Sequence, residues 1–503
     1  MNWKIIAKSL GHQDMRKRLL AVLGILLVFR ILAHLPVPLG DPQTLHQVLQ
    51  NLFNSNNTPQ LLSFINVISG GALANFSIMI AGLGPYINAS IIMQLLTKAI
   101  PQLEALHKEG EFGQKKINQY TRILTFPLSI IQAVGSIFLI RQYAQSIGGI
   151  GDITAHVGPW QWILMVAALS GGSMLLMWLG ELVTEQGVGN GISLLITVGI
   201  VSRLPSQISS IGSAIFTKKD HWHVFGHNLP INKTAFIYGL IIAVSVLVVT
   251  WLVVMLNEAA RDLTVNYAKR VQGNRAYGGI TTKLPVKLIT AGVVPIIFAV
   301  AFLSVPSFLG QLLVNNHSHN LAHLGSQLST WFQTPSAQTF ATLHWQAYIY
   351  PATYFLLVFV FTFFYTSITF NSKEIAENLH KQGGFIEGVR GGEQTEKHLG
   401  SIVNRLTLFG AISLGLLAVL PIIAQVFIPN ANITIGGTSV LILVSVALQT
   451  LRAVESRALM VTYDQYSQPD FFYDSDSFAV GSGGARILRY RPAFLKRRKK
   501  DTK

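Results

Sequence analysis

The residue types that usually carry enzymatic chemistry are nearly absent from the long apolar stretches of this chain. Apart from Arg30 and Arg203, these stretches contain no Lys, Arg, Asp or Glu. His34 is isolated near the end of one stretch, there is no His-Glu-x-x-His zinc motif, and the chain has no cysteine. No Gly-x-x-x-x-Gly-Lys-[Ser/Thr] loop for nucleotide phosphates occurs either. We therefore expect no enzyme, no metal and no cofactor, and any driving energy must come from a partner.

The remaining candidate chemistry is polar contact inside apolar helices and the packing of aliphatic side chains. One apolar stretch includes the run Gly82-Leu83-Gly84-Pro85-Tyr86-Ile87-Asn88-Ala89-Ser90-Ile91-Ile92-Met93-Gln94-Leu95-Leu96. Its Asn, Ser and Gln could form interhelical hydrogen bonds, typically worth about 0.6 kcal/mol each, or line a seam between helices. Aliphatic pairs four residues apart share one helical face, so each pair can point at one place.

The elements that must position these residues are membrane helices. Of the 503 residues, 50% are hydrophobic and only 12% are charged, about half the share usual for a soluble protein. Ten stretches approach the roughly 20 apolar residues that cross a bilayer. We predict spans at 19–36, 73–97, 123–140, 160–180, 191–211, 235–256, 288–310, 347–370, 406–428 and 434–451. Arg203 and Pro205 interrupt the fifth.

The basic residues indicate the orientation of these spans. The N-terminal segment, the loops after spans two, six and eight, and the tail together hold 32 of the 38 Lys and Arg residues. This asymmetry predicts that both termini and the basic loops lie in the cytoplasm. The formal net charge of +16 therefore reflects topology, since a nucleic-acid-binding protein would not distribute charge by alternate loops.

Two other classes of membrane protein are disfavoured. Ion-coupled transporters usually bury carboxylates near the midplane to bind protons or sodium, and the predicted spans contain none. A solute transporter of another family stays as the alternative. An intramembrane enzyme would need a catalytic constellation, which the spans lack.

Several stretches resemble the SecY family of protein-export channels, in that family's order. The run at 82–96 is the longest. The others are Gly113-Gln114-Lys115-Lys116-Ile117-Asn118-Gln119-Tyr120-Thr121-Arg122, Trp178-Leu179-Gly180-Glu181, Thr184-Glu185-Gln186-Gly187-Val188-Gly189-Asn190-Gly191-Ile192-Ser193, Val265-Asn266-Tyr267-Ala268-Lys269-Arg270, Ala376-Glu377-Asn378-Leu379, Gln382-Gly383-Gly384-Phe385-Ile386, Gly392-Glu393-Gln394-Thr395 and Gly436-Gly437-Thr438-Ser439. The resemblance covers roughly 15–455.

The resemblance implies an all-α polytopic protein with ten transmembrane helices in two inverted halves of five and a short plug half-helix. The implied segments are a cytoplasmic N-terminus (1–18), an N-terminal half (19–211, with the plug at about 59–74), an outer loop (212–234), a C-terminal half (235–455) and a basic cytoplasmic tail (456–503). Inverted repeats are a known way to build a path at the interface of two halves. We find no convincing internal repeat in the sequence itself.

The function that the resemblance implies is a channel for secretory polypeptides, with lateral exit for membrane segments. A ring of aliphatic side chains would close the pore by dewetting it. Matched motif by motif, the ring comprises Leu83, Ile87, Ile196, Ile200, Ile297 and Ile442. For any one of these residues taken alone, ordinary packing or contact with lipid is the commoner role of an aliphatic in a membrane helix.

The resemblance also assigns a plug and a lateral gate. The plug residues are Leu61, Leu62, Phe64, Ile65, Val67 and Ile68, in a stretch too short to span that could equally be interfacial or re-entrant. Spans two and seven resemble the two sides of the lateral gate, where Asn88, Ser90 and Gln94 would line the seam.

The implied partners are small SecE-like and SecG-like membrane subunits, a SecA-like motor ATPase, the ribosome, signal-bearing polypeptides and the bilayer of a bacterial plasma membrane. Arg261, Lys269, Arg270 and Arg390 are the candidate docking residues for the motor and the ribosome. Basic loop residues are also needed simply to keep loops inside. The run Lys496-Arg497-Arg498-Lys499-Lys500 in the tail is typical of attraction to anionic lipid, with ribosomal RNA as the alternative.

Four positions depart from the family pattern. Glu387 and Gly391 stand where proline is common, and Asp262 stands where a second basic residue is expected. These three changes affect the docking loops. Gly84 occupies a position that is commonly larger, which affects how the resting seal packs.

Overall fold

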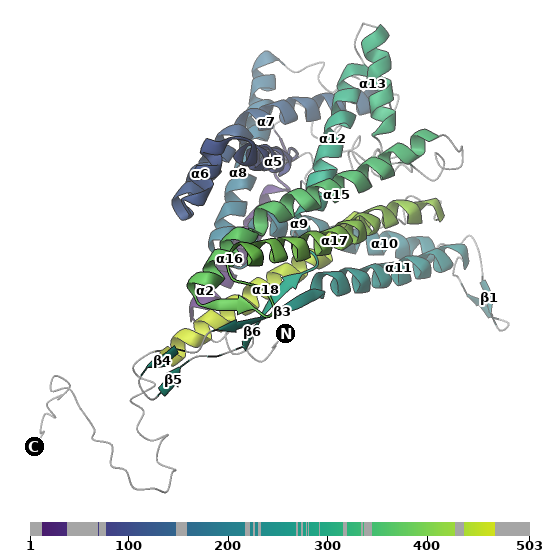
Figure 1. Cartoon of the computed structure of the whole chain (residues 1–503). Helices are drawn as coiled ribbons and strands as arrows, with labels where there is room; N and C mark the ends of the chain where they lie inside the picture. Colours follow the sequence, from purple (N-terminus) through teal and green to yellow (C-terminus); the bar gives the residue numbers. More distant parts are fainter. Residues whose placement is uncertain are drawn as a thin grey trace, which may run out of the picture.

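The computed structural model describes residues 13–37, 69, 77–146, 158–216, 222–224, 227–229, 233–267, 270–272, 275–277, 279, 281–290, 292–314, 319–332, 335, 345–427 and 437–467. Most of these residues are helical, and the helices pack side by side into one bundle (Figure 1). The α-helices are α2 (Gln13–Leu32), α5 (Gly84–Ala99), α6 (Pro101–Lys108), α7 (Glu111–Ser146), α8 (Pro159–Glu185), α9 (Gly191–Val201), α10 (Leu204–Ile215), α11 (Lys233–Glu258), α12 (Val294–Val314), α13 (His319–Trp331), α15 (Ile349–Thr369), α16 (Ser372–Lys381), α17 (Glu393–Phe427) and α18 (Gly437–Ser467).

Helices occupy part of every predicted span, but they differ in their ability to cross a bilayer. Among the described residues, six helices are long and apolar enough to do so, and 191–206 and 294–307 form shorter apolar helices. These findings support a polytopic helical membrane protein. The count of ten spans and the division into two inverted halves stay predictions.

The helices begin and end at other residues than the predicted spans, and the second and fifth spans differ in kind. The second was predicted from residue 73, but its helix α5 begins only at Gly84, with Pro85 in its first turn and a series of turns before it. The fifth is two helices, α9 and α10, because Pro205 has no N–H to donate to a carbonyl one helical turn back; it lies instead in the first turn of α10, where no such bond is needed. Ser202 and Arg203 form a turn that separates the two helices.

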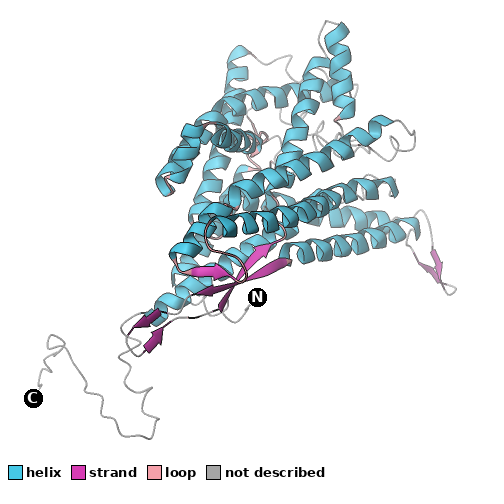
Figure 2. Cartoon of the chain, viewed as in Figure 1, coloured by secondary structure: helices cyan, strands magenta, loops and turns pink. Residues whose placement is uncertain are grey.

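The prediction of an all-α chain overlooked short strands and three helices between or beyond the spans. The strands are β1 (Trp222–Val224), β2 (His227–Leu229), β3 (Ala260–Tyr267), β4 (Arg270–Gln272), β5 (Arg275–Tyr277), β6 (Thr281–Lys287) and β7 (Gly384–Ile386). Figure 2 shows that the β1–β2 hairpin and the sheet containing β3 lie at opposite ends of α11. Helices α6, α13 and α16 are too short or too polar for a search based on spans to find them.

The largest sheet joins two loops that are far apart in the sequence. Its strand order is β6-β3-β7, and both pairings are antiparallel. An apolar cluster that includes Val265, Val286, Leu379, Ile386 and Leu399 connects this sheet with α16 and the first turns of α17. We call this assembly the sheet unit.

The main core of the bundle is one extended apolar cluster. It contains buried residues from α2, α5, α8, α9, α11, α12, α15, α17 and α18. Helix α5 packs against α12, and α9 packs against α18, so helices from the first and second halves of the sequence meet in the core. Burial of these side chains fixes the relative positions of the helices that carry the candidate site.

Close packing of α12 against α13 depends on glycine. A Cβ atom on Gly325 would lie 2.6 Å from the amide nitrogen of Val314, and one on Gly310 would lie 2.6 Å from the amide nitrogen of Ser329. Small residues let helix backbones approach closely, and any side chain here would push the two helices apart.

We therefore predict that Gly325→Ala lowers the free energy of unfolding by about 1–3 kcal/mol, as expected for overpacking. Thermal unfolding of the purified protein in detergent measures this change. Gly24→Ala is the matched control, because a Cβ there has no atom within 4 Å. Equal unfolding temperatures for the two variants would contradict the prediction.

Candidate functional site

The six residues predicted to form the pore ring are all buried in the main core cluster. They come from four helices: Leu83 and Ile87 from the start of α5, Ile196 and Ile200 from α9, Ile297 from α12 and Ile442 from α18. The cluster also contains many other aliphatic residues. All six therefore belong to one extended apolar cluster, while their meeting in a ring stays a prediction.

Local geometry aligns the two pairs that lie four residues apart. The amide of Ile87 donates a hydrogen bond to the carbonyl oxygen of Leu83 at 3.0 Å, so the two side chains sit one helical turn apart on one face. Ile196 and Ile200 have the same spacing on α9, whose start is capped by Asn190. The Asn190 side chain accepts hydrogen bonds from the amides of Ile192 and Ser193.

As far as the structure describes the interior around these residues, no fully buried side chain there carries a formal charge. The buried polar groups among the described residues are mainly serine and threonine hydroxyls, together with the hydroxyl of Tyr354 and Oε1 of Gln94. Several of the hydroxyls, including those of Thr97, Ser170 and Thr362, donate to carbonyls one helical turn back in their own helix. The Ser173 hydroxyl donates instead to the Gly82 carbonyl oxygen. No group of three or more potential metal ligands occurs in the part of the chain that the structure describes. The site can exclude water and ions, but it offers no fixed charge to bind a solute.

Arg30 of α2 reaches the turn between α9 and α10, which contains Ser202 and Arg203. The Arg30 guanidinium donates to the Ser202 hydroxyl at 3.0 Å, at the break between α9 and α10. The Ser202 hydroxyl in turn donates to the carbonyl oxygen of Gly199 at 2.8 Å. Arg30, to which the sequence assigned no function, thus satisfies polar groups at the break.

The three lateral-gate candidates lie half-buried on α5, the helix that contacts α12. The side-chain amide of Gln94 donates to the Ser90 hydroxyl at 3.2 Å. The Gln94 Oε1 atom is buried and has no hydrogen-bond partner among the described residues. Helices α5 and α12 contact each other, while the position of these three side chains at a seam between them stays a prediction. The buried unpaired acceptor of Gln94 makes its surroundings less stable than a fully satisfied site would be.

Gly84, which is small where the family is commonly larger, has its space filled by another side chain. A Cβ on Gly84 would lie 2.7 Å from Nε2 of Gln132, which projects from α7. Gln132 Nε2 also lies 3.5 Å from the carbonyl oxygen of Ala81, a long hydrogen bond. The structure therefore compensates for the missing side chain with a polar group from the neighbouring helix.

The plug residues 61–68 lie outside the described residues, and so does Lys269. Arg270 begins β4, but its side chain is not among those described. Arg261 on β3 and Arg390 after β7 are both exposed and belong to the sheet unit. The backbone carbonyl of Arg390 accepts a hydrogen bond from the Thr395 hydroxyl at 3.0 Å, which ties its loop to α17.

The unexpected Asp262 has a local partner. It forms an ion pair with Lys283 across β3 and β6, at 3.5 Å between Oδ2 and Nζ. Both side chains are more than half exposed, so the pair contributes little to stability. It does place a positive charge against the one acidic group next to Arg261.

Sequence reasoning missed two polar contacts that tie helices together. Arg122 of α7 forms a two-point ion pair with Glu181 of α8. Its Nε atom lies 2.9 Å from Oε1 of Glu181, and its Nη2 atom lies 2.6 Å from Oε2. Both residues stand within matched family motifs, a signal that could have paired them.

The second missed contact joins α11 to α18. The Asn257 side chain donates to the Ser445 hydroxyl at 3.2 Å, and Arg452 forms an ion pair with Glu258. Burial lowers the pKa of the nearby Lys287 ammonium, and the charge of Arg452 lowers it further while that of Glu258 opposes the shift. Lys287 ends β6, so this contact borders the segment that leads into α12.

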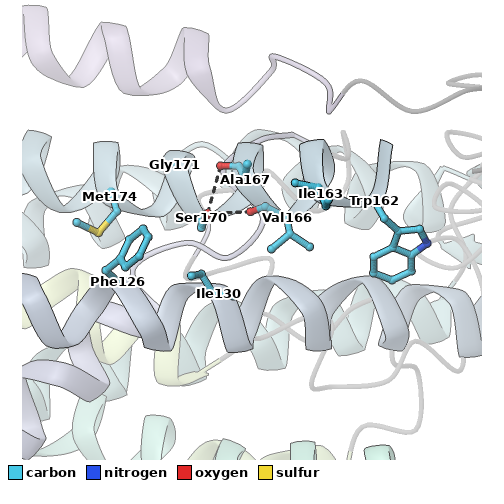
Figure 3. Close-up of a pocket in the computed structure, with 9 residues that line it drawn as sticks. All are labelled: Phe126, Ile130, Trp162, Ile163, Val166, Ala167, Ser170, Gly171 and Met174. Carbon is cyan, nitrogen blue, oxygen red and sulfur yellow. Dashed lines mark hydrogen bonds between the residues drawn. The ribbon is translucent and has the colours of Figure 1, made fainter. Parts of the chain in front are cut away.

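A separate apolar groove of about 500 Å³ lies between α7 and α8 (Figure 3). Its lining residues are Phe126, Ile130, Trp162, Ile163, Val166, Ala167, Ser170, Gly171 and Met174. The Ser170 hydroxyl is already bonded to the carbonyls of Val166 and Ala167 (Figure 3). None of the candidate pore residues lines this groove.

Comparison with known proteins gives one family from sequence, and solved structures share the fold. The SecY family profile matches residues 77–451. The protein translocase subunit SecY of Streptomyces coelicolor is 38% identical over 463 residues, which cover 92% of this chain and 98% of that protein. A solved SecY channel, described in a study of how its plug domain stabilises the closed state, has a TM-score of 0.54 at 19% identity and covers 86% of this chain and 90% of its own. Sec61 in a canine ribosome-channel complex has a TM-score of 0.52 at 18% identity and covers 87% of this chain and 91% of its own.

Substitutions of Gln94 and of Ser90 should affect the free energy of unfolding differently. We predict that Gln94→Leu leaves the free energy of unfolding unchanged or raises it by about 1 kcal/mol, because it removes a buried unpaired acceptor. Ser90→Ala should lower it by about 1 kcal/mol, because the Gln94 amide then loses its partner as well. Thermal unfolding in detergent separates the two, and a shift of the same sign and size in both variants would refute the assignment.

Proposed function

This chain belongs to the SecY family, and on that basis we propose that it is the pore subunit of a channel that conducts polypeptides through a membrane. The observation that carries the proposal is the family match over 77–451, which includes all six aliphatic residues. Secretory polypeptides would pass across the membrane through this subunit, and membrane segments would leave it sideways into lipid.

In the resting channel, the six aliphatic side chains form the constriction. They are Leu83, Ile87, Ile196, Ile200, Ile297 and Ile442, all buried in an apolar cluster to which the described part of the chain contributes no charged side chain. A constriction of this kind opposes water and ions by dewetting. It also yields to a passing chain without binding it, because aliphatic groups offer no directional contact.

Lateral exit requires α5 and α12 to separate. These helices contact each other in the structure, and Gln94 of α5 carries a buried Oε1 atom that has no hydrogen-bond partner among the described residues. A seam held by few directional bonds opens at low cost. The plug at 59–74 and the arrangement of ten spans in two inverted halves complete the proposal by family resemblance.

The proposed partners supply what the chain lacks. Without a nucleotide-binding loop, it needs a motor ATPase or a translating ribosome to drive transport. We propose that both dock on the sheet unit, where Arg261 and Arg390 are exposed. Small membrane subunits that resemble SecE and SecG would complete the channel.

The proposed location is the plasma membrane of a bacterium, with both termini in the cytoplasm. The supporting observation is the concentration of 32 of the 38 Lys and Arg residues in the N-terminal segment, alternate loops and tail. Arg261 and Arg390 lie on the side that this rule assigns to the cytoplasm.

Site-specific crosslinking tests the function. A photoreactive residue at Ile87, Ile196 or Ile297 should crosslink to a secretory chain that is stalled during transport, because all three positions border its path. Leu240 and Leu247, which are exposed on α11, are the controls and should label lipid. Crosslinks to the stalled chain from the α11 controls alone would refute the proposed path.

Charge reversal tests the docking surface. We predict that Arg390→Glu weakens binding of the motor and of the ribosome by about tenfold, because it replaces a favourable charge contact with repulsion. Binding to membrane vesicles that contain the variant measures this effect. Lys108→Glu is the control: Lys108 is exposed on α6, outside the sheet unit. Similar binding to both variants would show that Arg390 does not contact these partners and serves only to keep its loop on the cytoplasmic side.

A further inference from the structure

The turn 77–83 immediately before α5 is held in place more tightly than its lack of regular structure would indicate. Met79, Ile80, Ala81 and Leu83 are almost fully buried, although this segment forms turns and no helix. The Gly82 backbone has a φ of +59°, which glycine adopts without strain. Backbone groups buried outside regular structure need partners, because an unpaired one is costly.

One set of partners comes from the end of α2. The Ser77 hydroxyl donates to the carbonyl oxygen of Leu32 at 2.8 Å, and the Ile78 amide donates to that of Leu35 at 3.1 Å. Ser77 also forms an isolated antiparallel bridge with Pro36. These contacts secure the beginning of the turn.

The second set comes from two adjacent residues of α8. The Ser173 hydroxyl, fully buried, donates to the carbonyl oxygen of Gly82 at 3.0 Å. Gly172 lies directly against the turn, since a Cβ on it would be 2.1 Å from the carbonyl oxygen of Ile78. Real Cβ atoms essentially never come that close, so any side chain at 172 must displace the turn or the helix.

The consequence concerns the residues that follow the turn. Leu83 is the N-cap of α5, and Ile87 lies one helical turn further along. The turn therefore sets the height and the rotation at which both side chains enter the core. A shift of the turn by even one ångström would move both of them.

We infer that Gly172 and Ser173 are positioning residues, which hold the turn 77–83 so that Leu83 and Ile87 close the resting constriction. This inference rests on the proposed channel function. It makes the contact of α8 with the turn a determinant of how strictly the channel rejects polypeptides with weak signals. A signal must supply the energy that separates the closed and open states, so a less stable closed state needs a weaker signal.

The chain provides matched controls on the same helix. Gly171 is exposed toward the groove between α7 and α8, and a Cβ on it has no atom within 4 Å. Among the described residues, the Ser170 hydroxyl donates to two carbonyls of its own helix, those of Val166 and Ala167 (Figure 3). Gly172→Ala against Gly171→Ala, and Ser173→Ala against Ser170→Ala, thus compare identical chemical changes with and without the contact to the turn.

The experiment uses membrane vesicles from cells whose only copy of this subunit is the variant. Export of a precursor with an intact signal and of the same precursor with a weakened signal is measured, together with ion leakage at rest. For Gly172→Ala and Ser173→Ala we expect the ratio of weak-signal to intact-signal export to rise by about tenfold, the population shift that corresponds to one lost buried hydrogen bond. Ion leakage should rise as well. Ser173→Thr keeps the hydroxyl and should restore the ratio.

Three outcomes would overturn the inference. Equal ratios within both matched pairs would show that contact with the turn is irrelevant to selectivity. A proportional loss of both kinds of export would assign Gly172 and Ser173 to folding alone. If wild-type vesicles exported neither precursor, the proposed function itself would fail. Should Gly172→Ala not reach the membrane, the Ser173 pair decides the question.

Discussion

A bilayer provides no hydrogen-bond partners for the backbone, and this constraint shapes the whole molecule. Helices satisfy it within each segment, which is why most described residues are helical. Where the chain departs from a helix inside the bundle, side chains replace the missing partners. Ser77 and Ser173 do so around the turn before α5, and Arg30 contacts Ser202 at the break between α9 and α10. The irregular backbone is thus confined to places where neighbouring helices can bond to it.

The same constraint gives glycine a special importance in this chain. Without a hydrophobic driving force between helices in lipid, close van der Waals packing holds the bundle together, and glycine permits it. Gly172 packs against the turn before α5, and Gly191 packs against the backbone carbonyl of Gly180. Gly310 and Gly325 pack against each other between α12 and α13. Each contact fixes one helix relative to another. The apolar interior is therefore positioned by backbone contacts, while its side chains stay free of directional bonds.

Outside the apolar bundle, the chain builds a different kind of structure. The sheet unit pairs β3, which follows α11, with β7, which precedes α17. Tyr267 stands opposite Gly384 in this pairing, and its ring lies 3.1 Å from where a Cβ of Gly384 would be. Two motifs separated by more than a hundred residues in sequence are thus neighbours. The strand β6 leads from this unit toward α12, so the proposed docking surface is mechanically continuous with one side of the proposed gate.

The sequence by itself determined the class of the molecule, because hydropathy and the shortage of charge follow directly from composition and need no knowledge of packing. The motifs between residues 82 and 439 determined the family for the same reason: they are local in the chain. Helix ends were less predictable. Hydropathy does not distinguish the buried turn before α5 from the helix that follows, since Met79, Ile80 and Ala81 are as apolar as membrane helix residues. Only the tertiary structure revealed the sheet unit, the pair of Arg122 with Glu181 and the filling of the Gly84 position by Gln132, because each joins residues whose separation along the chain carries no information about their distance in space.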